Sequence, residues 1–259
     1  MAQRSRPDGR AFDALRPVEM VLGFHRMAEG SVLYRAGSTV VLATASIDEK
    51  VPPWMEGKGK GWVTAEYQMH PRSNPERRES RDGRGKAPSG RTQEIQRLVG
   101  RALRAAVDLT RVGERQIVID CDILEADGGT RTASVTAGFV ALSLAIAKLT
   151  KSGKITQPVI REPVAAVSVG TLENELALDL VYVEDSRAEV DLNLVATRSG
   201  AVIEVQGTAE GAPVPRKDID RMIDLALVGI GRLTELQTKV LADAGVDLKT
   251  LLVPRKEGA

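Results

Sequence analysis

The chain has 259 residues and a mass of 27.8 kDa, which is enough for one large domain with a substantial core. Hydrophobic residues make up 42% and charged residues 27%, and this composition excludes an intrinsically disordered chain. A single cysteine, Cys121, excludes an internal disulfide framework and a cysteine-rich zinc site. The two histidines, His25 and His70, have no serine or aspartate at a diagnostic spacing, so neither is assigned a catalytic role.

The N-terminal segment MAQRSRPDGR lacks the apolar core of a signal peptide. No stretch of the sequence approaches the run of about 18 apolar residues that a membrane span needs. We therefore expect a cytoplasmic protein without a membrane partner.

The formal net charge of +1 hides a segregation of charge along the chain. Residues 70–104 hold ten basic side chains against four acidic ones, whereas residues 162–259 hold ten against seventeen. Arginine dominates the basic stretch, and its planar guanidinium suits two-point contacts with phosphate. The stretch predicts a phosphate-facing or RNA-facing surface, with an ordinary solvated charged face as the alternative.

The first part of the chain predicts strands followed by a helix. Turn residues separate short β-rich segments, and a loop with prolines and glycines comes before the next strand. The arginine-rich segment up to Pro88 has no apolar period and is expected to be an exposed loop. The expected elements are strands at 18–24, 31–35, 39–47 and 63–69, a loop at 51–62, and a helix at 92–108 with Arg97, Arg101 and Arg104 on one face.

The second part continues with a strand, a helix, four strands and a long helix. Basic residues and Gly153 end the second helix, and Pro213 and Pro215 precede the last one. The expected elements are a strand at 115–125, a helix at 133–151, strands at 164–170, 176–183, 188–197 and 201–208, and a helix after Pro215.

No long linker and no repeat divides the chain, so we expect a single domain over residues 1–259, with a core from about 10 to 245 and a frayed tail after 253. Strands that follow one another through tight turns favour antiparallel or mixed sheets over a doubly wound parallel sheet. The predicted fold class is α+β (mixed α/β).

Two glycines followed by Thr-Arg-Thr lie in ADGGTRTAS, residues 126–134, between an expected strand and an expected helix. Glycine lets the backbone approach an anion closely, and a helix start offers unpaired N–H groups and the positive end of the helix dipole. Thr130 adds a hydroxyl and Arg131 a guanidinium. The segment lacks the Lys-Ser/Thr pair of a nucleotide P-loop, so it predicts a phosphate or phosphodiester site. A glycine turn with a threonine N-cap is the alternative.

The segment SGRTQEI, residues 89–95, repeats this arrangement, with Arg91 and the capping-type Thr92 at the start of the arginine-striped helix. Two arginines at two helix starts can hold one phosphate from two sides. The sequence leaves open whether they meet in space, and a capped helix with a surface arginine is the alternative.

Acidic residues gather in EDSRAEVD, residues 184–191, where Asp185 and Asp191 are six positions apart. A chain reversal at residues 186–187 between two strands would bring their carboxylates together. Such a pair can hold Mg²⁺ or Mn²⁺ through oxygen ligands or supply a general acid. A charged hairpin turn is the alternative.

Asp120 and Asp122 alternate in IDCDIL and share one face of an expected strand. They are candidate metal ligands, and they allow the hypothesis of a metal-dependent hydrolase. We favour the simpler interpretation that they lie on the wetted face of a half-buried strand. Cys121, on the opposite face, is then a core residue.

Together, these and further segments resemble ribonuclease PH, a family of phosphorolytic 3′-to-5′ exoribonucleases that trim transfer-RNA precursors. The resemblance runs from about residue 4 to the last long helix. It is carried by RPDGRAFDALRPV (6–18), AEGSVL (28–33), KGKGWVTAEYQMHPRS (58–73), SGRTQEIQRLVGRALRAAVDL (89–109), DCDILEADGGTRTAS (120–134) and DSRAEVDLN (185–193). It implies a ribonuclease PH-type domain of β-β-β-α-β-α order, assembled as a homohexameric ring that is a trimer of dimers.

The resemblance also implies roles for single residues. In the family the arginine of SGRT and the Gly-Thr-Arg of ADGGTRT bind the phosphate cosubstrate. The acidic pair of DSxAExD is catalytic and associated with Mg²⁺ or Mn²⁺. The matching positions in this chain are Arg91, Gly129, Thr130 and Arg131 for phosphate, and Asp185 and Asp191 for catalysis and metal.

Arginines after the PRS motif hold RNA in the family, and Arg72 and Arg77 match them in position. The following segment, RESRDGRGKAPSG (78–90), is longer and spaced differently from the family pattern. The third RNA-binding arginine is therefore Arg81 or, as the alternative, Arg78.

The activity that the resemblance implies is removal of 3′-terminal nucleotides from tRNA precursors and other RNAs, ribosomal RNA included, as nucleoside diphosphates. Inorganic phosphate is the attacking cosubstrate, and the reaction should reverse to nucleotide addition at a 3′ end. A non-catalytic RNA-binding ring subunit of an exosome-like assembly is the alternative. The presence of all three motifs argues against it.

Overall fold

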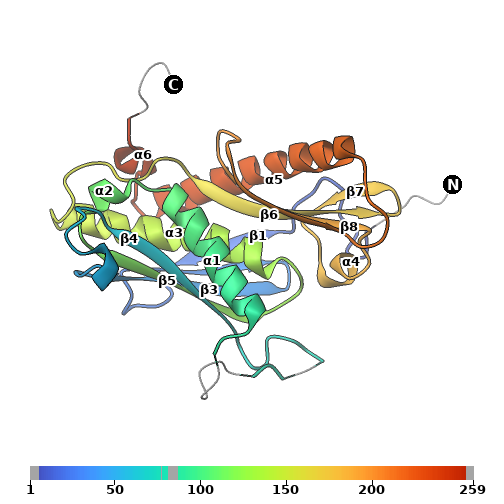
Figure 1. Ribbon diagram of the computed structural model, residues 1–259, viewed down its shortest axis with the longest axis horizontal. Helices are drawn as coiled ribbons and strands as arrows, with labels where there is room; N and C mark the ends of the chain where they lie inside the picture. The colour runs from blue at the N-terminus through green and yellow to red at the C-terminus, as the bar shows by residue number, and fades with distance from the viewer. Residues whose placement is uncertain (1–5, 77, 81–86, 255–259) are drawn as a thin grey trace.

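Two β-sheets form the framework of the protein, and the computed structural model describes residues 6–76, 78–80 and 87–254 (Figure 1). Most of the tail expected to fray lies outside these residues. The strands are β1 (Val18–Leu22), β2 (Gly30–Ala36), β3 (Thr39–Asp48), β4 (Trp62–Met69), β5 (Gln116–Glu125), β6 (Val164–Leu172), β7 (Glu175–Leu178), β8 (Val190–Thr197) and β9 (Val202–Ala209).

The first sheet has the order β1-β2-β3-β5-β4 and the second β7-β6-β8-β9. β4 and β5 are parallel, and every other neighbouring pair is antiparallel. This confirms the predicted α+β class with mixed and antiparallel sheets. The helices are α1 (Gly90–Ala105), α2 (Leu109–Val112), α3 (Thr130–Lys151), α4 (Tyr182–Asp185), α5 (Arg216–Asp243), α6 (Leu248–Leu251) and the short 3-10 helix η1 (Pro53–Met55).

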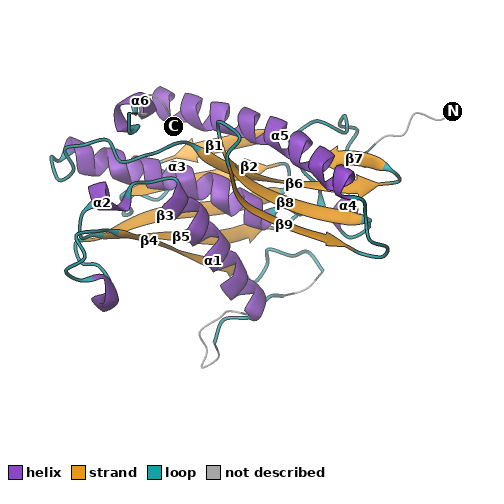
Figure 2. Cartoon of the chain, turned by 45° about the horizontal axis from the view of Figure 1, so that its top comes forward, coloured by secondary structure: helices purple, strands orange, loops and turns teal. Residues whose placement is uncertain are grey.

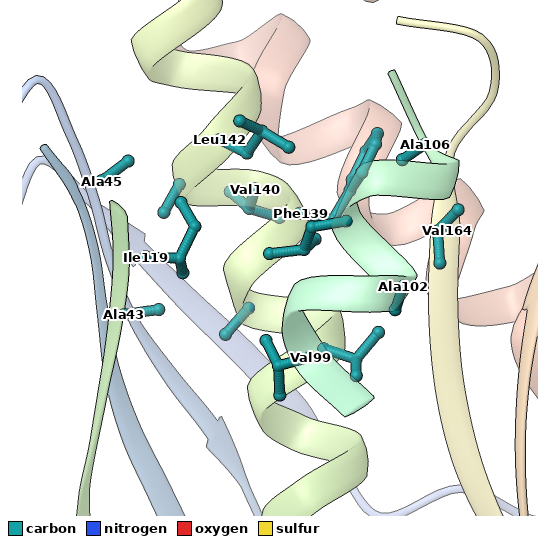
Figure 3. Packing of buried hydrophobic residues seen from close by; sticks show 14 of the residues in the cluster. Ala43, Ala45, Val99, Ala102, Ala106, Ile119, Phe139, Val140, Leu142 and Val164 are labelled. Atoms are coloured by element: carbon teal, nitrogen blue, oxygen red, sulfur yellow. The ribbon is translucent and has the colours of Figure 1, made fainter. Parts of the chain in front are cut away.

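Helix α3 lies between the two sheets and packs against β2 and β3 on one side and β6 on the other (Figure 3). Phe139, at its middle, is fully buried among side chains of both layers. α3 is long and apolar enough to pass as a membrane span, with a mean hydropathy of 1.6, a feature that the sequence reading missed. In its most apolar stretch of 18 residues, 83% is buried inside the protein, so α3 has the burial of a core helix.

Helix α1 is amphipathic, as its apolar spacing predicts. Ile95, Leu98 and Leu103 are buried against β4 and α3, while Arg97 and Arg101 are exposed. The helix begins at Gly90, and the Ser89 side chain caps it by accepting a hydrogen bond from the Thr92 backbone N–H. Ser89, and not Thr92, is therefore the capping residue.

Helix α5 covers the second sheet (Figure 2). Its buried face, which includes Met222, Ala226 and Ile230, packs on Leu192 and Leu194 of β8 in a second apolar cluster. Pro215 occupies its N-cap position, in agreement with the expected start.

The expected strand at 176–183 is wrong in its second half. β7 ends at Leu178, and Asp179 follows with a backbone φ of 57°, so the chain leaves the sheet there. Arg16 binds the Asp179 side chain and stabilises this turn. The chain then forms α4, so Asp185 lies at the end of a short helix and Asp191 on a strand. The charged hairpin turn between two strands, the alternative considered from the sequence, does not form in this described segment.

Candidate active site

A cleft of about 990 Å³ opens where β4 and β5 end and where α1 and α3 begin, and α4 and β8 form its opposite wall. Seven of the predicted site residues line this one cleft. They are Arg72, Arg91, Gly129, Thr130, Arg131, Asp185 and Asp191. The tertiary structure thus joins three motifs that are up to a hundred residues apart in the sequence.

The turn between β5 and α3 requires both of its glycines. Gly128 and Gly129 have φ values of 74° and 65°, which L-residues rarely adopt. A Cβ on Gly128 would lie 2.7 Å from the Leu180 carbonyl oxygen, and one on Gly129 would lie 2.8 Å from an Arg16 nitrogen. The glycines therefore let the start of α3 approach the loop before α4. The first-turn N–H groups of a helix have no partner within the helix, so this helix start can bind an anion.

The Thr130 side chain is already engaged. Its hydroxyl hydrogen-bonds the Tyr67 hydroxyl at 2.8 Å, and both residues are buried. Burial raises the pKa of Tyr67, while the bond to Thr130 and the charges of Arg91 and Arg131 oppose the rise. Tyr67 is a site residue that sequence reasoning missed, because in VTAEYQM it looks like an ordinary inward-facing strand position.

Arg91 and Arg131 approach the same carboxylate. Each lies in the first turn of its helix, Arg91 on α1 and Arg131 on α3. Desolvation raises the pKa of Asp185, and the positive charges of Arg131 and Arg91 counteract that rise. The starts of α1 and α3 therefore contribute guanidinium groups to one site. The sequence did not show whether these two arginines are close in space.

The acidic wall consists of the end of α4 and the start of β8. Asp185 is the last residue of α4 and is exposed, while Asp191 is half-buried as the second residue of β8. The Asn193 side-chain amide donates to both Asp191 carboxylate oxygens at 3.3 and 3.4 Å. Asn193 is thus a further site residue, found only through the structure.

Burial raises the pKa of Asp191 to about 6, and the charges of Asp185 and Glu210 add to the rise. Arg131 and Asn193 offset it only in part. Two neighbouring carboxylates with raised pKa values favour a bound cation, and their oxygens suit Mg²⁺ or Mn²⁺. Among the described residues, no three or more His, Cys, Asp or Glu side chains are arranged so that they could hold a metal ion together. A cation at the aspartate pair would therefore keep water or substrate ligands, as Mg²⁺ usually does.

Two buried arginines of the N-terminal segment hold the acidic wall in place. Arg6 forms a two-point pair with Glu184 at 2.8 and 2.6 Å and also donates to the Leu178 carbonyl. Arg16 donates to Asp179 at 2.6 Å and to the Asp127 carbonyl at 2.7 Å, so it joins this wall to the glycine turn. In the sequence these arginines appeared only as part of the segment that resembles ribonuclease PH.

The predicted RNA-binding arginines are only partly described. Arg72 is exposed and lines the cleft. Arg77 and Arg81 lie outside the described residues, and Arg78, the alternative to Arg81, is exposed.

Asp120 and Asp122 lie in a separate cleft of about 540 Å³, next to Glu66. Asp120 is half-buried and Asp122 exposed, which confirms the predicted wetted strand face. Burial and the charge of Asp122 raise the pKa of Asp120. Cys121 lies in the core at 2% exposure, also as expected.

Comparison with known proteins places this geometry in context. The model of the 3′ exoribonuclease family matches the chain in two parts, domain 1 at residues 14–147 and domain 2 at residues 162–229. These matches confirm the resemblance to ribonuclease PH that the motifs indicate.

Three solved structures are similar in fold. Rice (Oryza sativa) Rrp46 has a TM-score of 0.74 and 20% identity, with 91% of this chain and all of Rrp46 covered. The Archaeoglobus fulgidus exosome with RNA bound to the active site scores 0.72 at 22% identity, covering 89% of this chain and 92% of that one. An archaeal exosome core scores 0.69 at 21% identity, covering 90% and 91%.

Proposed function

Since the chain belongs to the 3′ exoribonuclease family of ribonuclease PH, we propose that it is a phosphate-dependent 3′-to-5′ exoribonuclease. It would release 3′-terminal nucleotides as nucleoside diphosphates and add nucleotides in the reverse direction. One observation carries the proposal: a single cleft sets two helix-start arginines, Arg91 and Arg131, against the carboxylate pair of Asp185 and Asp191.

The central physical problem of this reaction is the repulsion between an attacking phosphate and an RNA phosphodiester. Arg91, Arg131 and the N–H groups that follow Gly129 supply positive charge and donors on one wall of the cleft. Because these groups are held by two helices, little reorganisation is needed when charge develops in the transition state. They would bind the phosphate cosubstrate and orient it for in-line attack.

The opposite wall serves the other half of the reaction. Asp185 and Asp191 would hold Mg²⁺ or Mn²⁺, with Asn193 orienting the Asp191 carboxylate. When bound, the cation supplies electrostatic stabilisation of the phosphoryl oxygens. The leaving 3′ oxygen needs a proton or a cation, and this carboxylate pair would provide one of them.

The RNA would reach the cleft past Arg72, with Arg77 and Arg81 as further phosphate contacts. The proposed substrates are tRNA precursors and other RNA 3′ ends, in the cytoplasm. The proposed assembly is a homohexameric ring, a trimer of dimers, which would gather the basic segments of its subunits around one entry.

The decisive experiment incubates the protein with a 3′-tailed RNA and Mg²⁺, with and without inorganic phosphate, and identifies the released nucleotides. We expect nucleoside diphosphates, formed only when phosphate is present. The Asp191→Asn variant should lose this release and still bind RNA. Release of monophosphates, or equal release without phosphate, would contradict phosphorolysis.

A second candidate is a non-catalytic RNA-binding subunit of an exosome-like ring. The similarity of the fold to Rrp46 and to exosome chains favours this candidate, whereas the complete set of charged groups in the cleft favours the first. The experiment with tailed RNA and phosphate also distinguishes the two candidates. A protein that binds the tailed RNA but neither releases diphosphates nor elongates the RNA from them would be the ring subunit.

A further inference from the structure

The Gln206 side chain on β9 connects Arg131 to two carboxylates. Its Oε1 accepts a hydrogen bond from Arg131 Nη1 at 2.9 Å. Its Nε2 donates to Glu94 of α1 at 3.0 Å and to Glu204 of β9 at 3.1 Å. Glu204 in turn pairs with Arg101 of α1 at 2.9 Å. One amide thus lies at the junction of α1, α3 and β9.

The chemistry of these neighbours determines the orientation of the amide. Carboxylates only accept hydrogen bonds and a guanidinium only donates them. The Gln206 NH₂ group must therefore face Glu94 and Glu204, and its oxygen must face Arg131. A flipped amide would place its oxygen against two negative charges and its NH₂ against a positive one.

This arrangement leaves most of the Arg131 guanidinium available. Within the described part of the chain, its contacts with Gln206 and, at 3.4 Å, with Glu94 both use Nη1. Nε and Nη2 remain for a two-point contact with an anion, which is the geometry in which arginine binds phosphate best. Gln206 also donates a hydrogen bond to Glu94. Without that bond, the Glu94 carboxylate would compete more strongly with phosphate for Arg131.

The register of the second sheet ties this contact to the acidic wall. Gln206 on β9 pairs directly with Asn193 on β8, and Asn193 donates to Asp191. Directly paired residues of adjacent strands have side chains on the same face. The same pair of residues therefore orients one group of each wall, Arg131 and Asp191.

We propose that Gln206 is a positioning residue for the phosphate cosubstrate: it holds Arg131 in its binding orientation and restrains Glu94 from neutralising it. The inference rests on the proposed function, because it assumes that phosphate is the ligand of Arg131. It predicts that Gln206 affects phosphate affinity and leaves RNA affinity unchanged.

The test compares the wild type with Gln206→Leu and Gln206→Glu. Since hydrogen bonds to charged groups contribute about 1.5–3 kcal/mol, we expect the KM for phosphate to rise roughly tenfold or more in Gln206→Leu. The Kd for RNA should change by less than about twofold, because the RNA contacts are spread over other cations. The kcat should change by a smaller factor than the KM for phosphate, because Arg131 itself is retained. Gln206→Glu keeps the length of the side chain but adds a third carboxylate, so its KM should rise as well.

A second substitution separates positioning from a general structural defect. If Glu94 captures Arg131 once Gln206 is gone, Glu94→Gln in the Gln206→Leu background should recover part of the phosphate affinity. Ser199→Ala, in the turn between β8 and β9, is the matched control and should leave the KM unchanged. Folding of each variant is checked by circular dichroism and thermal unfolding.

Phosphate binding is also measured without RNA, from the rise in unfolding temperature that phosphate causes. A wild type that is stabilised by phosphate but performs no phosphorolysis would contradict the proposed function while leaving the inference testable on binding alone. A folded Gln206→Leu protein with wild-type phosphate affinity would overturn the inference. So would an equal loss of RNA affinity, or no stabilisation of the wild type by phosphate.

Discussion

Single side chains divide the cleft into a cationic wall and an acidic wall. On the first, Arg91 and Arg131 extend from helix starts, and on the second, Asp185 and Asp191 come from α4 and β8. The residue types were evident in the sequence. Desolvation raises the pKa of both aspartates, and the charge of Arg131, joined by that of Arg91 at Asp185, offsets the rise only in part.

Replacing Arg91 by alanine should raise the KM for phosphate at least tenfold, since a desolvated charge-assisted contact contributes roughly 1.5–3 kcal/mol. The Kd for RNA should stay within about twofold, because RNA contacts are spread over several cations. Steady-state kinetics at varied phosphate and a filter-binding assay measure the two quantities. Arg97→Ala, exposed on the same helix but outside the cleft, is the control. An equal loss of RNA binding in Arg91→Ala would show that its role is different.

Replacing Asp191 by asparagine should stabilise the metal-free protein at pH 8. The pKa of Asp191 is raised to about 6, so the folded state binds this proton more tightly than the unfolded state, and the ionised carboxylate opposes folding above that pH. We expect a gain of about 1 kcal/mol after allowing for partial exposure. The gain should shrink as the pH falls through 6 toward 4, where the wild-type group is neutral.

Urea unfolding in EDTA at several pH values measures this effect. Asp224→Asn, an exposed position on α5, is the control and should change the free energy of unfolding by less than about 0.5 kcal/mol. A gain that is independent of pH, or a loss at pH 8, would contradict the assignment.

At the scale of elements, the walls of the cleft depend on close approaches between loops. The glycine turn before α3 contacts the loop at residues 180–182, and Arg16 and Arg6 bind the segments on both sides. Gln206 and Asn193 come from paired positions on β9 and β8. The site is thus assembled by strand register and turn geometry as much as by its charged residues.

The importance of the close approach at Gly128 can be tested by comparison with Gly57, a glycine of similar backbone φ whose added Cβ would meet no atom. Gly57 has a φ of 72° and nothing within 4 Å of an added Cβ, whereas Gly128 has a φ of 74° and the Leu180 oxygen at 2.7 Å. Gly57→Ala should lower the free energy of unfolding by about 1 kcal/mol through backbone strain. Gly128→Ala should lower it by about 3 kcal/mol, because overpacking adds to the strain.

Urea unfolding compares the two variants, and phosphate titration shows whether the anion site is distorted. Gly128→Ala should also weaken phosphate binding, while Gly57→Ala should not. Equal losses of stability in both variants would show that the contact with residue 180 is unimportant.

Several elements could be predicted because their patterns are local. The apolar spacing of α1, the proline before α5 and the alternation in β5 all depend on neighbours within a few positions. The strand expected at 176–183 failed because Asp179 leaves the sheet to bind Arg16, a partner 163 positions away. Thr92 looked like a cap, but Ser89 supplies the hydrogen bond. No role for Tyr67, Asn193 or Gln206 was evident in the sequence. Tyr67 and Gln206 have hydrogen-bond partners that are remote in the sequence.

On the scale of the whole molecule, exposed apolar side chains and free sheet edges indicate assembly. β9 is an edge strand of the second sheet, and Val202 and Val205 on it are 50% and 43% exposed. Edge strands with apolar side chains favour association, which would bury both the side chains and the unpaired backbone groups.

The proposed homohexameric ring predicts a particle with about six times the mass of the 27.8 kDa chain, because an interface repeated around a rotation axis closes into a ring. Size-exclusion chromatography with light scattering measures this mass over a range of protein concentrations and at low and high salt. A monomer at every concentration would contradict the ring for this chain alone. A stable dimer would show that only one of the two ring interfaces forms.

The sequence by itself determined the fold class, most element positions and the chemical types of the site residues, because these depend on composition and on short-range periodicity. Its net charge of +1 concealed an arginine-rich stretch and an acidic C-terminal part. Only the tertiary structure decided that these opposite charges line one cleft, that Tyr67 hydrogen-bonds the Thr130 hydroxyl, and that Gln206 accepts a hydrogen bond from Arg131. These are long-range contacts, and they exist only once the two sheets have packed around α3.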